Sequence, residues 1–173
     1  MTTAHQRSAN KLHELLGQVL QRYHIEYEDH LTNHISQGLI ALYRLGASEE
    51  QLQKWSDGYL QNTLDPVVNR AVPSEGRITE DNFRDYLGKK VHFLDYVDFY
   101  HGEITKRGLS HTITRFMEIL HRGECGAAFH AMIQLGYGAD VMNDGVMAEG
   151  LAYLSYAYTP FFAPRMACVC PNF

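Results

Sequence analysis

The chain has 173 residues, of which 45% are hydrophobic and 20% are charged, and this balance excludes a wholly disordered protein. Its length is that of one compact domain. The formal net charge of −5 at pH 7 argues against a general nucleic-acid binder, which needs a basic face. The sequence predicts no membrane-spanning segment and no secretory signal, so we expect a cytoplasmic protein that acts away from membranes.

The cysteines do not form the pattern of a disulfide framework or a zinc site. Cys125, Cys168 and Cys170 cannot all pair within one chain. One residue separates Cys168 from Cys170, and no second cysteine pair exists to complete a four-cysteine zinc site. We therefore expect free thiols, as in a reducing compartment.

Apolar residues recur every three or four positions almost throughout, so the sequence predicts an all-α fold, a single-domain multi-helix bundle over residues 1–173. No stretch alternates like a convincing β-strand. Residues 65–78 are expected to be a looser stretch, and residues 160–173 an irregular tail. Ser8 is predicted to cap the first helix, and a second runs from about Asp29 to Leu45 and stops at Gly46. A capping box of Ser48 and Gln51 opens a third helix. The remaining predicted helices are a short one from Thr79 to Gly88, one at Val91–Arg107, one capped by Ser110, one at Gly126–Tyr137 and one at Val146–Tyr158.

Histidine is over-represented, with 10 residues where average abundance would give about four. His30 and His34 are four positions apart on a predicted helix, which places both rings on one face, one turn apart. That spacing suits a metal, with Glu28 and Asp29 next to them as ligands or supporting partners. The alternative is a surface pair, or a capped core histidine, because such spacings arise by chance in a histidine-rich chain.

His130 stands alone among small and apolar residues, in the segment Gly126–Ile133. A buried imidazole needs partners for its nitrogens, or it costs free energy. One interpretation is a core histidine with both nitrogens satisfied. The other is a ligand or a general base that faces an interior cavity.

Four segments carry a resemblance to a known family. Residues 31–36 and 39–47 come first, followed by residues 127–137 and 149–153, and they occur in the family's order. Together they resemble the questin oxidase-like family. The resemblance implies an α-helical oxidoreductase that uses O2 to oxidise an aromatic, polyketide-type small molecule such as an anthraquinone. It also implies NADPH as a co-substrate and, in some members, a non-haem iron held mainly by histidines.

On this resemblance, His34 and His130 match positions that would ligate iron and act in catalysis. His30, His92 or Glu149 would complete the ligand set, since a mononuclear iron site usually takes three protein ligands. The chain departs from the fuller metal motif at Gln134, where such members tend to carry a second histidine one turn after the first. Members also continue well beyond the last helix, so a short or truncated member is expected.

The substrate side of the site is expected to include Asn33, Tyr43 and Tyr137, which would contact or orient a small aromatic molecule between the helices. The sequence contains no glycine-rich dinucleotide fingerprint, so a nicotinamide cofactor held on a Rossmann core is not predicted. The alternative to an enzyme is a catalytically inactive helical module that keeps the family core without a complete metal site. Such a module would dimerise to cover its apolar tail.

Overall fold

The computed structural model describes residues 3–28, 30–63 and 78–160, and within them it confirms the all-α fold. Seven α-helices in these residues are accompanied by one small antiparallel sheet, in which Glu26 pairs with Thr32 and Tyr27 with Leu31. The elements are α1 (Ala4–Arg22), β1 (Glu26–Tyr27), β2 (Leu31–Thr32), α2 (Ile35–Arg44), α3 (Glu49–Thr63), α4 (Phe93–Arg107), α5 (Leu109–Leu120), α6 (His130–Asp140) and α7 (Asp144–Tyr156). Short 3-10 turns at Phe83–Tyr86, Lys90–His92, His121–Gly123 and Gly126–Phe129 connect them.

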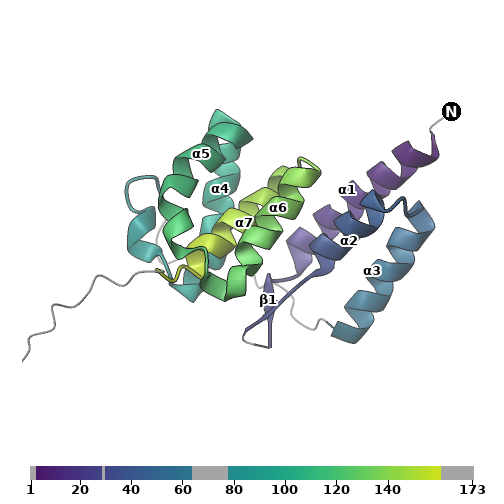
Figure 1. Cartoon of the computed structure of the whole chain (residues 1–173), viewed down its shortest axis with the longest axis horizontal. Helices are drawn as coiled ribbons and strands as arrows, with labels where there is room; N and C mark the ends of the chain where they lie inside the picture. The colour runs from purple at the N-terminus through teal and green to yellow at the C-terminus, as the bar shows by residue number, and fades with distance from the viewer. Residues whose placement is uncertain (1–2, 29, 64–77, 161–173) are drawn as a thin grey trace, which may run out of the picture.

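Helix α7 is the centre of the molecule, since every residue from Val146 to Tyr156 is buried. Helices α4, α5 and α6 pack around it to form one apolar cluster, and α1, α2 and α3 form a second. Val146, in the first turns of α7, belongs to the second cluster and so joins the two. Figure 1 shows this arrangement, with α4–α7 on one side and α1–α3 on the other.

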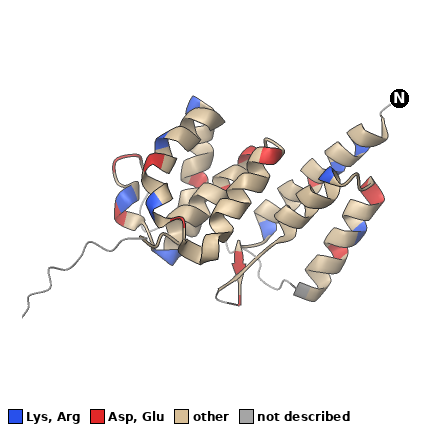
Figure 2. Cartoon of the chain, in the orientation of Figure 1, with Lys and Arg blue, Asp and Glu red and all other residues tan. Residues whose placement is uncertain are grey.

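Acidic and basic side chains are scattered over the outer helices and gather into no single basic face in the view of Figure 2. Both signs of charge are present in this view, and the formal net charge of the chain is −5. None of the helices in the described residues is long and apolar enough to cross a membrane.

Two predicted helix boundaries are confirmed in atomic detail. Gly46 has φ +88° and ends α2, with its N–H bonded to the Tyr43 carbonyl and the next N–H bonded to the Leu42 carbonyl. This is the pattern that glycine favours after a helix C-terminus. At the start of α3, the Ser48 N–H donates to Gln51 Oε1 (2.8 Å) and the Gln51 N–H donates to Ser48 Oγ (3.3 Å), which is the predicted capping box.

Two predicted caps are wrong. Thr3, not Ser8, caps the first helix, because its Oγ1 accepts the Gln6 N–H, and Ser8 lies buried one turn inside. Helix α5 begins at Leu109, directly after Gly108, and Ser110 lies within its first turn. The positive φ of Gly108 (+81°) sets the entry into this helix without a side-chain cap.

The predicted helix from Asp29 to Leu45 is wrong over residues 30–34, which hold strand β2 and a turn, and Asp29 lies outside the described residues. Asn33 causes the late start, because its Oδ1 accepts the Ile35 N–H (3.0 Å) and its Nδ2 donates to the His24 carbonyl (3.1 Å). The Asn33 N–H also donates to the Ile25 carbonyl (2.8 Å). Helix α2 therefore begins at Ile35.

The helix predicted from Gly126 begins instead at His130, because Ala127, Ala128 and Phe129 all have positive φ. Cys125 is a free thiol, while Cys168 and Cys170 lie outside the described residues. The same holds for residues 161–173 of the predicted tail and for residues 65–77 of the predicted looser stretch.

Candidate functional site

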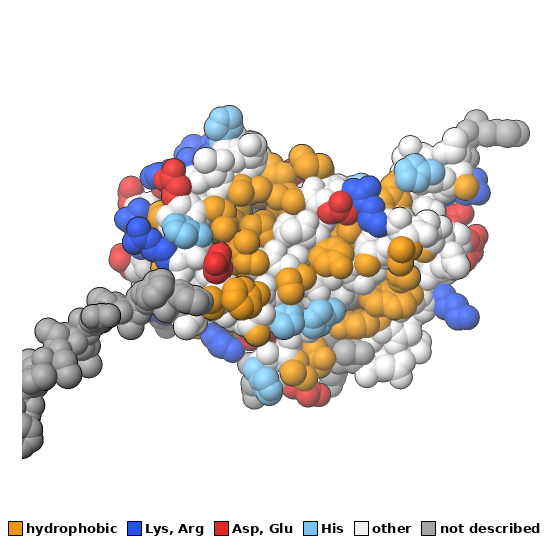
Figure 3. All heavy atoms as spheres, in the orientation of Figure 1, with side chains coloured by type: hydrophobic (Ala, Val, Ile, Leu, Met, Phe, Trp, Pro, Cys, Tyr) orange, Lys and Arg blue, Asp and Glu red, His pale blue; other side chains and the backbone are white. Residues whose placement is uncertain are grey.

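Two histidines from distant parts of the chain meet at the first turns of α2 and α6. The rings of His34 and His130 contact edge to face, with centroids 5.1 Å apart and planes at 77°. His34 is exposed and His130 is half-buried. On the face turned to the viewer in Figure 3, histidine side chains lie among hydrophobic ones near the N-terminal end of α6. The pair is thus open to solvent on one side and backed by the helix interface on the other.

The structure fixes which nitrogen of His130 carries the hydrogen. His130 Nδ1 lies 2.7 Å from the carbonyl oxygen of Ala127, and a carbonyl oxygen can only accept. Nδ1 therefore donates, and in the neutral ring Nε2 keeps its lone pair for a proton, a substrate hydroxyl or a metal. Burial lowers the pKa of His34, and the neighbouring His130 ring lowers it further, against a hydrogen bond to the backbone of Thr32. His34 is accordingly a neutral imidazole at pH 7.

Helices α2 and α6 run parallel and in register, which sets the two rings side by side. At the far ends of these helices, Arg44 Nε donates to Asp140 Oδ2 (2.6 Å), and its second nitrogen donates to Asp140 Oδ1 (3.0 Å). Both the ring contact and this ion pair join residues that are 96 positions apart. A contact at each end therefore holds the seam between the two helices.

Glu149 lies behind the seam, on α7, and is held by Gln134. Gln134 Nε2 donates to Glu149 Oε2 across 2.6 Å, and both side chains are buried. Gln134 is one turn after His130 on α6. Glu149 also lines a pocket with residues of α1 and α4, among them Gly17 and Val97, and neither histidine lines that pocket.

The other predicted residues do not converge on the pair. His30 lies exposed in the hairpin turn, so the prediction that His30 and His34 share a helix face is wrong. Asn33 is buried and its amide is used to shape the turn before α2. Tyr43 bonds through its hydroxyl to His5 Nε2 (3.2 Å), nine residues beyond His34 and on the opposite side of α2.

Tyr137 is the one predicted aromatic residue on the same face of α6 as His130, two turns further along, or about 10 Å by helix rise. It is half-buried and packs against the cluster formed by α1, α2 and α3. Tyr137 therefore lies along the seam rather than at its open end.

A complete iron site does not fit the described residues alone. Among them, no group of three or more histidine, cysteine or acidic side chains could hold a metal ion. His34 and His130 offer two nitrogens, whereas an iron site open to oxygen and substrate usually needs three protein ligands. We therefore assign no reaction step to iron.

A second buried network, which the sequence did not indicate, joins the hairpin to α7. Tyr153 donates to Glu26 Oε1 (3.0 Å), Tyr156 donates to the other oxygen of Glu26, and Lys90 Nζ pairs with that oxygen at 3.0 Å. The Tyr153 hydroxyl also lies 2.8 Å from Thr32 Oγ1. Burial raises the pKa of both tyrosines, so they remain protonated donors that anchor the strand leading to His34. Since the contacts of the two tyrosines span more than 120 positions, no local pattern could reveal them.

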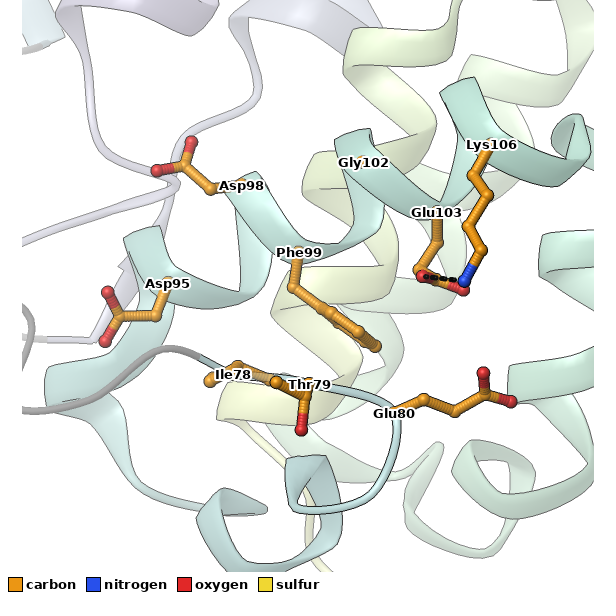
Figure 4. Close-up of a pocket in the computed structure, with 9 residues that line it drawn as sticks. All are labelled: Ile78, Thr79, Glu80, Asp95, Asp98, Phe99, Gly102, Glu103 and Lys106. Carbon is orange, nitrogen blue, oxygen red and sulfur yellow. Dashed lines mark ion pairs between the residues drawn. The ribbon is translucent and has the colours of Figure 1, made fainter.

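The cleft of about 700 Å³ beside α4 differs in kind from the histidine pair. Figure 4 shows its aromatic residue, Phe99, between the Ile78–Thr79 segment and an ion pair of Glu103 with Lys106. Glu80 also lines this cleft, and Arg107 and Arg115 lower the pKa of its carboxyl to about 2 by donating hydrogen bonds to it. The carboxylate of Glu80 forms ion pairs with both arginines, as expected of a structural ion-pair network rather than a catalytic group.

Comparisons with known proteins assign the region that contains the pair. Residues 31–167 match the family described as Questin oxidase-like. The chain is 24% identical over 153 residues to a Baeyer–Villiger oxidase of Pestalotiopsis fici, covering 80% of this chain and 34% of that protein. It is 27% identical over 135 residues to a Baeyer–Villiger oxidase of Emericella nidulans (69% and 29%) and 23% identical over 132 residues to the questin oxidase of Aspergillus terreus (71% and 29%). The chain therefore spans about a third of the length of these curated relatives.

Proposed function

The chain belongs to the questin oxidase-like family, and on that premise we propose that it takes part in the O2-dependent oxidation of a small aromatic molecule at the His34–His130 pair. The relatives named Baeyer–Villiger oxidases support an oxidoreductase of this type. A Baeyer–Villiger oxidation inserts one oxygen atom of O2 beside a carbonyl. The second atom leaves as water when NADPH supplies two electrons, and this assigns NADPH the role of co-substrate.

The observation that carries the proposal is the orientation of the two imidazoles. His130 Nε2 is left as an acceptor by the bond from Nδ1 to Ala127, and the lowered pKa keeps His34 neutral. A neutral imidazole at the surface end of a helix seam can accept the proton of a phenolic hydroxyl. Removal of that proton makes an aromatic ring richer in electrons and easier to oxidise. The same two nitrogens would be the iron ligands of this chain, should a third ligand join them.

The test measures oxygen uptake and product mass with questin as substrate and NADPH present, for wild type and for His34→Ala and His130→Ala. We expect both variants to lose at least about a hundredfold in rate, the lower end of the contribution of a general base. The control is His111→Ala, an exposed histidine on α5 that should leave the rate unchanged. Wild-type turnover that both variants retain would rule out the pair as the site.

Metal content is measured on the same proteins after anaerobic loading with Fe(II) and desalting. About one iron per chain, lost in both variants, would assign the pair a metal-binding role. Turnover without retained iron would favour acid–base chemistry at the same nitrogens.

A second candidate is the catalytically inactive helical module. The observation that favours it is the Gln134–Glu149 hydrogen bond, which engages the carboxylate that the sequence predicts as a third iron ligand. This function predicts a stable dimer that takes up no oxygen and retains no iron. Sedimentation of the purified chain together with the oxygen assay separates it from the oxidase.

A further inference from the structure

A cleft apart from the histidine pair opens between α1 and α4, and the beginning of α7 also lines it. Its volume is about 640 Å³, within the range of small-molecule sites in proteins. The cleft lies where the two apolar clusters adjoin, since Leu20 packs with one cluster and Phe93 belongs to the other. Neither His34 nor His130 lines it, so the proposed function leaves this cleft unused.

The two helical walls of the cleft are largely apolar. Leu20 lies on α1, and Phe93, Leu94 and Val97 lie on the first two turns of α4. Phe93 is buried, and the other three are half-buried, so part of their apolar surface is still open to a ligand. Such walls favour a molecule with an apolar body, because its transfer out of water is favourable.

Gly17 leaves the α1 wall of the cleft open. It lies inside a helix of 19 residues, where glycine is less favourable than alanine. A Cβ at this position would meet no atom within 4 Å among the described residues, so their packing does not require a glycine here. The contrast is Gly145, on the α7 side of the same cleft, where a Cβ would lie 2.8 Å from Leu20 Cδ1. Gly17 therefore gives a ligand room beside α1.

The charges in the lining are negative. Glu149 is 6% exposed, and its Oε2 accepts a hydrogen bond from Gln134 Nε2 on the α6 side of α7. Asp98 lines the cleft from α4, and Figure 4 shows its carboxylate pointing away from Phe99. No lysine or arginine is among the described residues of the lining. A cleft with one sign of charge and low-dielectric walls concentrates ions of the opposite sign.

The neutral polar groups at the α7 end of the cleft are engaged in local bonds. Asn143 Oδ1 accepts the Val146 N–H (3.0 Å), which caps α7, and Asn143 Nδ2 lies 3.5 Å from His13 Nδ1. A carboxylate, by contrast, accepts several hydrogen bonds at once, so the bond from Gln134 is compatible with a further donor on Glu149. The carboxylates are thus the groups suited to hold the polar end of a ligand.

We propose that the cleft between α1 and α4 binds a primary amine with an apolar body, whose ammonium group pairs with Glu149 and Asp98 while its body lies along Gly17 and Val97. The ammonium group donates three hydrogen bonds and carries the charge opposite to that of the lining. A carboxylate ligand of the same shape is repelled, and a neutral one gains nothing from the charge. This site is separate from the histidine pair, and the inference goes beyond the proposed function.

The experiment titrates the full chain with three probes that share one apolar body: octylamine, 1-octanol and octanoate. Calorimetry is run without NADPH or iron at pH 8, above the ordinary pKa of histidine (about 6.5) and below that of a primary amine (about 10.4). We expect one octylamine per chain, bound at least tenfold more tightly than 1-octanol, and no binding of octanoate. His34→Ala and His130→Ala should bind octylamine as wild type does.

Two substitutions locate the probe. Glu149→Gln keeps an acceptor for Gln134 but removes the charge, and should weaken octylamine at least tenfold while leaving 1-octanol unchanged. Its control is Glu118→Gln, at an exposed position on α5, which alters the net charge equally and should change neither. Gly17→Leu fills the cleft, and should weaken octylamine at least tenfold without lowering the Tm. Gln18→Leu, at the next and exposed position of α1, is the matched control.

Four results would overturn the inference. Octylamine that binds no better than 1-octanol, or no better than octanoate, would show that the cleft does not select an amine. Wild-type affinity in Glu149→Gln or in Gly17→Leu would place the bound amine elsewhere. A lower Tm in Gly17→Leu would show that the space beside α1 is already filled. Equal weakening of octylamine in Glu149→Gln and Glu118→Gln would reduce the effect to net charge. Because none of these titrations involves turnover, they stand whether or not the histidine pair oxidises a substrate.

Discussion

His130 acquires its orientation from the three residues that precede it. Ala127, Ala128 and Phe129 have φ of +49°, +50° and +66°, a left-handed conformation that costs an L-residue about 1–2 kcal/mol. This run turns the Ala127 carbonyl toward His130 Nδ1 and leaves the Phe129 side chain 49% exposed beside the pair. Backbone strain of this kind concentrates at functional sites, where the geometry it enforces is used.

The electrostatic coupling of the pair leads to a titration prediction. The pKa of His34 lies below 6.5 through burial and through the His130 ring, so it should rise in His130→Ala, where one of these causes is removed. Proton NMR of the imidazole signals against pH measures this change directly. A His34 pKa that stays the same in His130→Ala would contradict the ring contact.

The same lowered pKa predicts how stability depends on pH. Burial lowers the pKa of His24 as well as that of His34, so below pH 6.5 the unfolded chain binds more protons at these positions than the folded one. Their contribution to stability is complete above pH 6.5 and is lost as the pH falls toward the folded-state values. Urea unfolding at a series of pH values should show a smaller acid loss in His34→Gln than in wild type. A larger loss would mean that the folded state favours the charged ring.

At the residue scale, the family resemblance assigned His34 and His130 to one site, and the structure brings their rings together. Helical spacing instead paired His30 with His34. The spacing argument failed because the Asn33 side chain ends the hairpin and delays α2 to Ile35.

At the scale of elements, helix type was predictable and helix ends were less so. The Gly46 stop and the Ser48–Gln51 box are local patterns, and both were found as predicted. The late start of α6 depends on three left-handed residues, none of which is glycine, and propensity rules disfavour that conformation. The β1–β2 hairpin is held by contacts to α7 that the local sequence does not contain.

Close packing of α6 on α7 predicts opposite effects for two glycine substitutions. A Cβ on Gly150 would lie 2.8 Å from the backbone of Leu135, so Gly150→Ala should cost about 1–3 kcal/mol by forcing the helices apart. Gly136, on α6, has nothing within 4 Å of its Cβ position, so Gly136→Ala should add about 0.5–1 kcal/mol through helix propensity. Urea denaturation of both variants gives the comparison, and equal effects would contradict the packing of α6 on α7.

Asn33 offers a second test at this scale, since one side chain shapes the entry into α2. Asn33→Ala removes the acceptor of the Ile35 N–H and the donor to the His24 carbonyl, and should cost about 1–3 kcal/mol. Asn62→Ala is the control, because this exposed amide bonds only one carbonyl on its own helix, that of Gly58, among the contacts described. Comparable losses in the two variants would mean that Asn33 does not hold the turn.

For the molecule as a whole, the two apolar clusters share α7 and should unfold together. Trp55, the single tryptophan, packs in the cluster of α1–α3, so its fluorescence reports on that side alone, whereas far-UV circular dichroism reports on all helices. Leu151→Ala, in the other cluster and fully buried, should cost about 2–5 kcal/mol and lower both transitions equally. Leu16→Ala, fully buried in the Trp55 cluster, should shift the same two signals by a similar amount.

If Leu151→Ala leaves the fluorescence transition in place while circular dichroism becomes biphasic, the clusters are independent, and α2 and α6 need not stay in register. The His34–His130 contact would then depend on an interface weaker than the one described, because each histidine begins a helix anchored in a different cluster.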